Sequence, residues 1–243
     1  MKHREIFSNL LTIPPVFVRL DGRAFHRVAE LWALERPFDE RFSRAMEDVS
    51  IRLISDSGLS PDFAFTFSDE INLYFSSLPF KGRVEKIDSV AASFAASALT
   101  LAMSSAGPLS FDARIIHVTP DVATEYLINR QREAWRNHLN AYCQDALMND
   151  GMSRKDAALY LKGRPSKELH ELMFSHGVNL ARTPTWQRRG VLVYKKIKNI
   201  EGFNPKLEKM VETVRTYVVS DRELPVFGSP EGKEFLSLLI GSF

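Results

Sequence analysis

Short continuous apolar runs predict four β-strands in the first half of this chain. Residues 15–20 are apolar except for Arg19, which is typical of a buried strand. Two β-rich runs at 62–67 and 71–77 flank a short polar bend, the pattern of a hairpin. A fourth apolar run occupies residues 113–118.

Helical spacing of apolar residues fills the gaps between these runs. Residues 38–53 form one predicted helix, with Asp39 as its N-cap, and Ala-rich residues 84–104 form another. The order of elements is therefore β-α-β-β-α-β, the ferredoxin-like arrangement. In that arrangement the first and third strands lie side by side and antiparallel.

In the second half of the chain, most apolar residues follow helical spacing. We predict helices at 122–149 (one helix or two), 153–161 and 166–174, and an additional edge strand at 191–197. The tail from Pro205 has a mixed pattern. We therefore expect an α+β protein in which residues 1–120 form the core and 121–243 a mainly helical appendage that does not fold independently.

Composition and charge are those of an ordinary globular protein. The chain has 243 residues, 44% hydrophobic and 26% charged, with a net charge of +2 that does not by itself indicate nucleic-acid binding. One cysteine, Cys143, excludes an internal disulfide and a Cys-based zinc cluster. The polar start at residues 1–5 and the lack of a run of about 20 apolar residues favour a cytoplasmic protein without a membrane span.

Three carboxylates stand where the predicted strands begin or end. Asp21 closes the first strand, and Asp69 and Glu70 lie in the bend before the third. The β-α-β-β-α-β order brings these strand ends together at one sheet edge, the geometry of a polymerase-type palm. Paired carboxylates there suit Mg²⁺, which usually accompanies phosphate chemistry. Each carboxylate alone has an ordinary interpretation, as a strand-end turn or a polar hairpin loop.

Other catalytic motifs are absent from the sequence. Gly22 follows the first carboxylate and would let a phosphate approach the main chain, but no P-loop motif occurs. The six histidines lack metal-ligand spacing, and no nucleophile elbow is present. His26 suits a packed role as well as a functional one.

Basic and aromatic residues alternate between residues 182 and 198. This segment, which we call the basic strip, contains six basic residues, Trp186 and Tyr194, but no acid. Such a strip can bind a phosphate backbone or stack on a base, although a lysine-protected edge strand has the same composition. Further basic residues stand at Arg130, Arg132 and Arg136.

Taken together, these segments resemble the tRNA-histidine guanylyltransferase superfamily. The resemblance covers about residues 5–200 in order. It is carried by Asp21-Gly22-Arg23-Ala24-Phe25-His26, Arg36-Pro37-Phe38-Asp39, Ser68-Asp69-Glu70, Phe111-Asp112-Ala113-Arg114, Arg130-Gln131 and Pro184-Thr185-Trp186-Gln187-Arg188-Arg189-Gly190.

The resemblance implies a polymerase-like enzyme that extends tRNA at its 5′ end, with GTP and ATP as substrates and two Mg²⁺ ions. It implies catalytic roles for Asp21, Asp69 and Glu70, with Asp21, Gly22 and Asp69 as metal ligands. The implied nucleotide-binding residues are Gly22, Arg23, Ala24, Phe25, His26, Arg36, Ser68, Asp69, Arg83 and Lys86. The residues expected to contact RNA are Arg130, Arg136, Asn137, Trp186, Arg188, Arg189, Lys195 and Lys196.

Departures from the family pattern indicate a branch. Residues 135–141 are closer to the Arg-Asn-x-Leu-Asn form of bacterial and archaeal relatives than to the eukaryotic His-Ile-Asn-Asn-Leu-Tyr-Asn signature. Arg36 replaces the family's activation-site lysine, and Leu169-His170-Glu171 replaces Lys-Asn-Glu. The resemblance then implies template-dependent repair of 5′-truncated tRNA by a homo-oligomer, a dimer or tetramer. Alternatives are the addition of one guanosine to histidine tRNA, a nucleotidyl cyclase, and a catalytically silent tRNA-binding protein.

Overall fold

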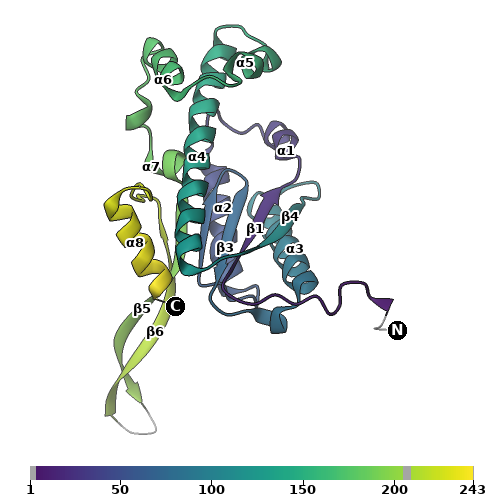
Figure 1. The fold of residues 1–243 in the computed structure, drawn as a ribbon, viewed down its shortest axis with the longest axis vertical. Helices are drawn as coiled ribbons and strands as arrows, with labels where there is room; N and C mark the ends of the chain where they lie inside the picture. The colour runs from purple at the N-terminus through teal and green to yellow at the C-terminus, as the bar shows by residue number, and fades with distance from the viewer. Residues whose placement is uncertain (1–3, 205–208, 243) are drawn as a thin grey trace.

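A six-stranded antiparallel sheet forms the centre of the computed structural model, which describes residues 4–204 and 209–242 (Figure 1). Part of the polar start at 1–5 and residues 205–208 of the tail lie outside the described residues. The strand order β4-β1-β3-β2 is the predicted ferredoxin-like order, which is confirmed, and β5 and β6 extend it. The strands are β1 Val16–Gly22, β2 Phe63–Phe67, β3 Glu70–Phe75, β4 Phe111–His117, β5 Val191–Asn204 and β6 Lys209–Asp221.

Two helices, α2 (Glu40–Ser55) and α3 (Val84–Ala102), pack on one face of the sheet. Alternate side chains of β1, such as Val18 and Leu20, point to this face and are fully buried. The Asp39 side chain caps α2 as predicted, because its carboxylate accepts a hydrogen bond from the Phe42 N–H at 3.1 Å. Both helices are present close to their predicted positions.

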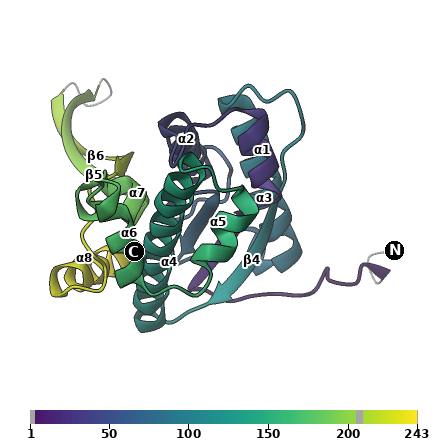
Figure 2. The same ribbon diagram turned by 90° about the horizontal axis from the view of Figure 1, so that it is seen from above.

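The single long helix α4 (Pro120–Asn149) covers the other face of the sheet (Figure 2). Phe17 of β1 points to this face and stacks on Tyr126 of α4, with ring centroids 4.5 Å apart. The helix α8 (Pro230–Gly241) completes this second core beside β2 and β5. Residues 122–149 are therefore one helix rather than two, and α4 is part of the core structure.

The C-terminal half of α4 extends beyond the sheet and carries a small helical tip (Figure 1). There α5 (Arg154–Leu161), α6 (Ser166–Ser175) and the 3-10 turn η3 (Leu180–Arg182) surround a third apolar cluster. The Ser153 side chain caps α5, as predicted, and Cys143 is buried within the cluster.

The part of the chain after residue 190 differs most from the prediction. The predicted strand at 191–197 is present, but β5 continues to Asn204 and pairs with β6, so it is not at the edge of the sheet. Together β5 and β6 form a hairpin that projects from the body (Figure 1). Across the described residues, no helix is both long and apolar enough to cross a membrane. The short helices α1 (Phe25–Leu31) and α7 (Thr185–Arg189), the strand β6 and the helix α8 were not expected.

Candidate active site

The carboxylates meet at one end of the sheet, as the strand order predicts. Asp21 of β1 lies directly opposite Glu70 of β3 in the antiparallel register, and Asp69 immediately precedes β3. The Gly22 N–H donates a hydrogen bond to the Asp69 carbonyl oxygen at 3.1 Å. Strand pairing and this backbone bond therefore fix the relative positions of the strand ends that carry the two aspartates.

Asp69 stands out because its carboxylate has no cationic partner among the residues that the structure describes. Its side-chain contact is with the Ser68 hydroxyl, which donates a hydrogen bond to Asp69 Oδ1 at 3.2 Å. Burial raises the pKa of Asp69, and the neighbouring carboxylate of Asp21 raises it further. Within the described ranges, no Lys, Arg or His forms an ion pair with Asp69. A desolvated carboxylate next to a second carboxylate is an environment that a divalent cation would stabilise.

The other two carboxylates are already paired with arginines. Arg19 Nε donates to Asp21 Oδ2 at 3.0 Å, because residues two apart on a strand share a face. Arg130 of α4 pairs with the buried carboxylate of Glu70 at 3.2 Å. Asn72 Nδ2 also donates to Glu70, at 2.8 Å. Burial raises the pKa of Glu70, while Asn72 and Arg130 oppose this effect.

These pairings change the expected roles of two residues. The carboxylate of Glu70 is held in a side-chain network, which continues through Asn72 to a hydrogen bond donated by the Tyr126 hydroxyl at 2.6 Å. Arg130, which we expected to contact RNA, instead directs its guanidinium to Glu70 and is only 17% exposed. The reason is its position on α4, which faces the sheet there.

The donor set fits a magnesium ion that is bound together with a nucleotide. Among the residues that the structure describes, no group of three or more His, Cys, Asp or Glu side chains could hold a metal. Asp21 and Asp69 offer two carboxylates, and Gly22 can add its carbonyl oxygen. Mg²⁺ is commonly held by one or two carboxylates, with phosphates and water completing its ligands. The residues present therefore fit this mode of binding rather than an all-protein cage.

A cavity of about 810 Å³ opens beside Asp69, between α1, the start of α2, the β2–β3 bend, α4 and α7. Its volume lies within the range of small-molecule sites. Six phenylalanine and tryptophan side chains line it: Phe25, Trp32, Phe38, Phe42, Phe67 and Trp186. Of the residues predicted from the sequence, the lining includes Gly22, Ala24, Phe25, His26, Arg36, Ser68, Asp69, Asn137 and Trp186.

Gly22 is required by the packing next to the carboxylates. A Cβ atom at this position would lie 2.5 Å from the Phe25 ring, so a larger residue would displace that side chain. Phe25 is itself buried and contacts Phe42 and Phe111, with ring centroids 6.1 and 5.2 Å apart. These contacts anchor α1 against the sheet and place Ala24 and His26 along the cavity.

The structure does not bring every predicted nucleotide-binding residue to this cavity. Arg83 and Lys86 lie at the start of α3, at the opposite end of β3 from Asp69. The six residues of β3 separate the two ends by about 17–20 Å, and neither side chain lines the cavity beside Asp69. Lys86 instead lies over the Phe80 ring, 4.6 Å from its centroid. Arg23 is exposed and does not line the cavity.

The basic strip is divided between α7 and β5. Arg188 Nε donates to the Thr183 carbonyl at 2.9 Å, and an Arg189 N–H donates to the Leu224 carbonyl at 2.6 Å. These two guanidiniums therefore hold loops of their own chain. Lys195 lies 3.5 Å from the Ser60 carbonyl, while Lys196 is exposed beside Tyr194.

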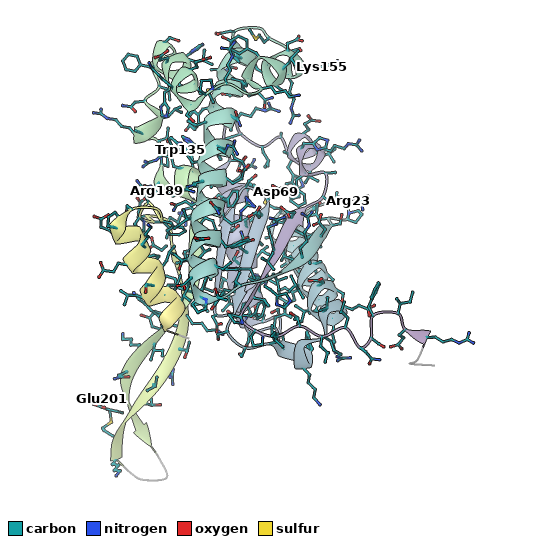
Figure 3. All side chains as sticks on the ribbon, in the orientation of Figure 1. Arg23, Asp69, Trp135, Lys155, Arg189 and Glu201 are labelled. Carbon is teal, nitrogen blue, oxygen red and sulfur yellow. The ribbon has the colours of Figure 1, made fainter. Side chains whose placement is uncertain are left out.

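Trp186 and Arg136 complete the set predicted for RNA contact. Trp186 lines the cavity and has the Arg222 guanidinium 4.7 Å from its ring centroid. Arg136 is exposed on α4, outside this cavity, and pairs with Glu133 at 3.5 Å. Figure 3 shows Trp135 and Arg189 on the side of α4 that faces away from Arg23.

Sequence reasoning missed two groups of residues at this site. Arg19 could have been found, because its spacing of two from Asp21 places both side chains on one face of β1. Asn140, Gln144 and Gln187 also line the cavity, but they become neighbours only through the packing of α4 and α7.

Comparisons with known proteins agree with this architecture. Residues 1–119 match the family model described as tRNAHis guanylyltransferase. The chain is similar to tRNA(His) guanylyltransferase 2 of Arabidopsis thaliana, at 29% identity over 218 residues that cover 83% of this chain and 39% of the relative. The chain thus spans less than half of the length of that relative.

Two solved structures of a bacterial tRNA(His) guanylyltransferase-like protein have the same fold. The complex with ATP aligns with a TM-score of 0.76 and 22% identity, covering 99% of this chain and 96% of the other. The complex with GTP aligns with a TM-score of 0.71, at the same identity and coverage. The chain thus shares its overall fold with these two structures.

Proposed function

We propose that the chain belongs to the tRNAHis guanylyltransferase superfamily and that it adds nucleotides to the 5′ end of tRNA in the 3′–5′ direction. The observation that carries this proposal is the position of Asp69, whose desolvated carboxylate lies beside Asp21 and borders the 810 Å³ cavity. A cavity of this size accommodates a nucleoside triphosphate, and its aromatic lining suits a base.

The proposed substrates are tRNA and nucleoside triphosphates. ATP and GTP, the nucleotides bound in the bacterial structures, are the expected triphosphates. The tRNA carries an activated 5′ end, either a triphosphate or a monophosphate joined to AMP. The 3′-hydroxyl of the incoming nucleotide attacks this end, a new phosphodiester bond forms, and pyrophosphate or AMP leaves. No protein nucleophile takes part.

Each residue of the site has a defined task in this scheme. Asp21, Asp69 and the Gly22 carbonyl would hold two Mg²⁺ ions, which lower the pKa of an attacking hydroxyl and neutralise charge on a leaving phosphate when bound. Arg19 orients the Asp21 carboxylate through its 3.0 Å contact. Arg36, which lines the cavity, is positioned to contact a phosphate.

We further propose that addition is templated, so that the enzyme repairs 5′-truncated tRNA. The support is the sequence of α4 at residues 135–141, which lacks the eukaryotic signature. The test is nucleotide addition to a set of tRNAs that lack their first nucleotide and differ in the opposing 3′-strand base. We expect the added nucleotide to follow the opposing base. Guanosine addition whatever that base is would instead indicate the histidine-tRNA activity.

Two other functions make different predictions in the same experiment. A silent tRNA-binding protein would bind the tRNA without extending it, whereas a nucleotidyl cyclase would convert ATP or GTP to a cyclic product without tRNA. The proposal also includes a cytoplasmic location and a homo-oligomer, a dimer or tetramer, and light scattering of the purified protein measures the latter.

A further inference from the structure

A second cavity, of about 620 Å³, adjoins the first along α4. It lies between α4, α5 and the loop at residues 162–166 that leads into α6, at the end of α4 far from the projecting hairpin (Figure 1). Asn140 and Gln144 line both cavities. An RNA strand that leaves the first cavity can therefore reach the second by passing over these two side chains.

The second cavity is basic. Arg136, Lys162 and Arg164 line it, and Glu133 is the one acidic side chain in its described lining. The two arginines form exposed ion pairs with glutamates three or four positions away in sequence, Arg136 with Glu133 at 3.5 Å and Arg164 with Glu168 at 2.7 Å. Such pairs contribute little free energy, so a phosphate can replace the carboxylate at small cost.

The start of α6 and the loop before it border the cavity beside these cations. Pro165 precedes α6 and provides no side-chain cap, and Pro165 and Ser166 both line the cavity. Gly163 has a φ of +76°, and a Cβ at this position would meet nothing within 4 Å, so the loop is open at that point. Three cations, an open loop and the start of a ten-residue helix thus surround one cavity.

The lining also distinguishes a backbone phosphate from a free nucleotide. No aromatic ring is among the described residues that line the second cavity, whereas six phenylalanine and tryptophan side chains line the first. A base in the second cavity would have no lining ring on which to stack, whereas a phosphate could pair with the lining cations. The first cavity therefore suits a terminal nucleotide and its base, and the second suits the backbone phosphates of the RNA strand that follows it.

We infer that the second cavity binds backbone phosphates of the tRNA strand whose 5′ end occupies the first cavity. The inference rests on the proposed function, because it assumes that tRNA is the substrate. Arg136, Lys162 and Arg164 are the residues that contact the phosphates, and Asn140 and Gln144 lie between the terminal nucleotide and this contact.

The first test compares tRNA affinity with nucleotide affinity. Arg136→Gln, Lys162→Gln, Arg164→Gln and the triple variant are compared with Lys155→Gln, an exposed residue of α5 outside both cavities (Figure 3). We expect the triple variant to weaken tRNA binding on the order of tenfold and to reduce the log-log salt slope by roughly 0.7–0.9 per lost phosphate contact. The Kd for GTP and the Lys155→Gln control should not change.

The second test locates the contact on the RNA. In tRNA whose phosphates nearest the 5′ end are neutral methylphosphonates, the triple variant and the wild-type protein should bind equally well. Equal binding is expected because the substitutions in the protein and the neutral phosphates in the RNA remove the same contact.

Three results would overturn the inference. These are wild-type tRNA affinity in the triple variant, a loss that persists undiminished with methylphosphonate tRNA, or an equal loss of GTP affinity. A wild-type protein that neither binds nor extends tRNA would overturn the proposed function as well. Tight wild-type binding with unaffected variants would overturn this inference alone.

Discussion

Replacing Arg130 with methionine tests the assignment of this residue to the protein interior. Its guanidinium pairs with Glu70 at 3.2 Å, and the two side chains are only 17% and 9% exposed. Arg130→Met keeps most of the side-chain volume but leaves the Glu70 carboxylate buried without its cation. If Arg130 were instead a surface contact for RNA, the substitution would weaken tRNA binding and leave stability unchanged.

The structure gives the size of the expected effect. Removing one partner of a buried ion pair costs about 3–5 kcal/mol. The cost here should be lower, about 2–3 kcal/mol, because Glu70 keeps the hydrogen bond from Asn72 at 2.8 Å and Arg130 is partly exposed. For a chain of this size, that corresponds to a decrease in Tm of roughly 5–10 °C.

The pH dependence of the stability deficit in Arg130→Met identifies its cause. Arg130 lowers the pKa of Glu70 against the raising effect of burial, so its removal moves this pKa further up. Protonation of Glu70 then relieves the cost, and the deficit in unfolding free energy should be largest at neutral pH and shrink as the pH falls through the raised pKa.

Urea unfolding of four proteins measures this effect: wild type, Arg130→Met, Glu70→Gln, and the double variant. The double variant should recover most of the lost stability, because it has no unpaired buried charge. An Arg130→Met protein as stable as wild type, or a double variant no better than Arg130→Met, would refute the reasoning.

Three further outcomes are expected from the described contacts. In EDTA at pH 7, the unfolding free energy of Asp69→Asn should equal or exceed that of the wild type, because burial raises the pKa of Asp69 and makes its ionisation in the folded state costly. A clear loss of stability of this variant in urea unfolding would contradict the prediction. His138, fully buried with its pKa lowered to about 4, should make stability fall as the pH falls from 6.5 to about 4, and His138→Phe should remove this dependence in the same assay. Arg189→Gln should lower Tm, since its guanidinium holds the Leu224 carbonyl, whereas Lys196→Gln should change only the salt dependence of tRNA binding.

The palm and its carboxylates could be predicted because local signals and topology agree there. Each of its strands is an apolar run bounded by turn residues, and the β-α-β-β-α-β order determines which strand ends meet. Asp21 and Asp69 are 48 residues apart in sequence, yet the strand order alone brings the ends that carry them together. The helices α2 and α3 follow from apolar spacing in the same way.

Later elements were missed because their sequences carry weak signals. The outer part of β6 packs against no core, so Val214 and Met210 are exposed and its alternation of apolar and polar residues carries no burial pattern. The helix α7 has five residues and ends where Gly190 adopts a φ of +77°, which is too short for a periodic pattern. The α8 segment follows a tract rich in Gly and Pro that hides its helical spacing.

Residue roles were hardest to predict where the partner is distant in sequence. Arg130 and Glu70 are 60 residues apart, and nothing local distinguishes Arg130 from an exposed helical arginine. Arg83 was assigned by resemblance alone, although the direction of β3 already places the start of α3 at the end of the sheet away from Asp69.

The most direct measurement of the central claim is nucleotide addition to a labelled tRNA that lacks its first 5′ nucleotide. Wild-type protein freed of metal, Asp69→Asn and Lys155→Gln are each incubated with this tRNA, ATP and GTP, with and without Mg²⁺. We expect wild type and Lys155→Gln to restore the full-length tRNA only with Mg²⁺, while folded Asp69→Asn binds the tRNA but extends it at least about a hundredfold more slowly. Extension by Asp69→Asn at the wild-type rate, or no extension by a folded wild-type protein that binds this tRNA, would contradict the account.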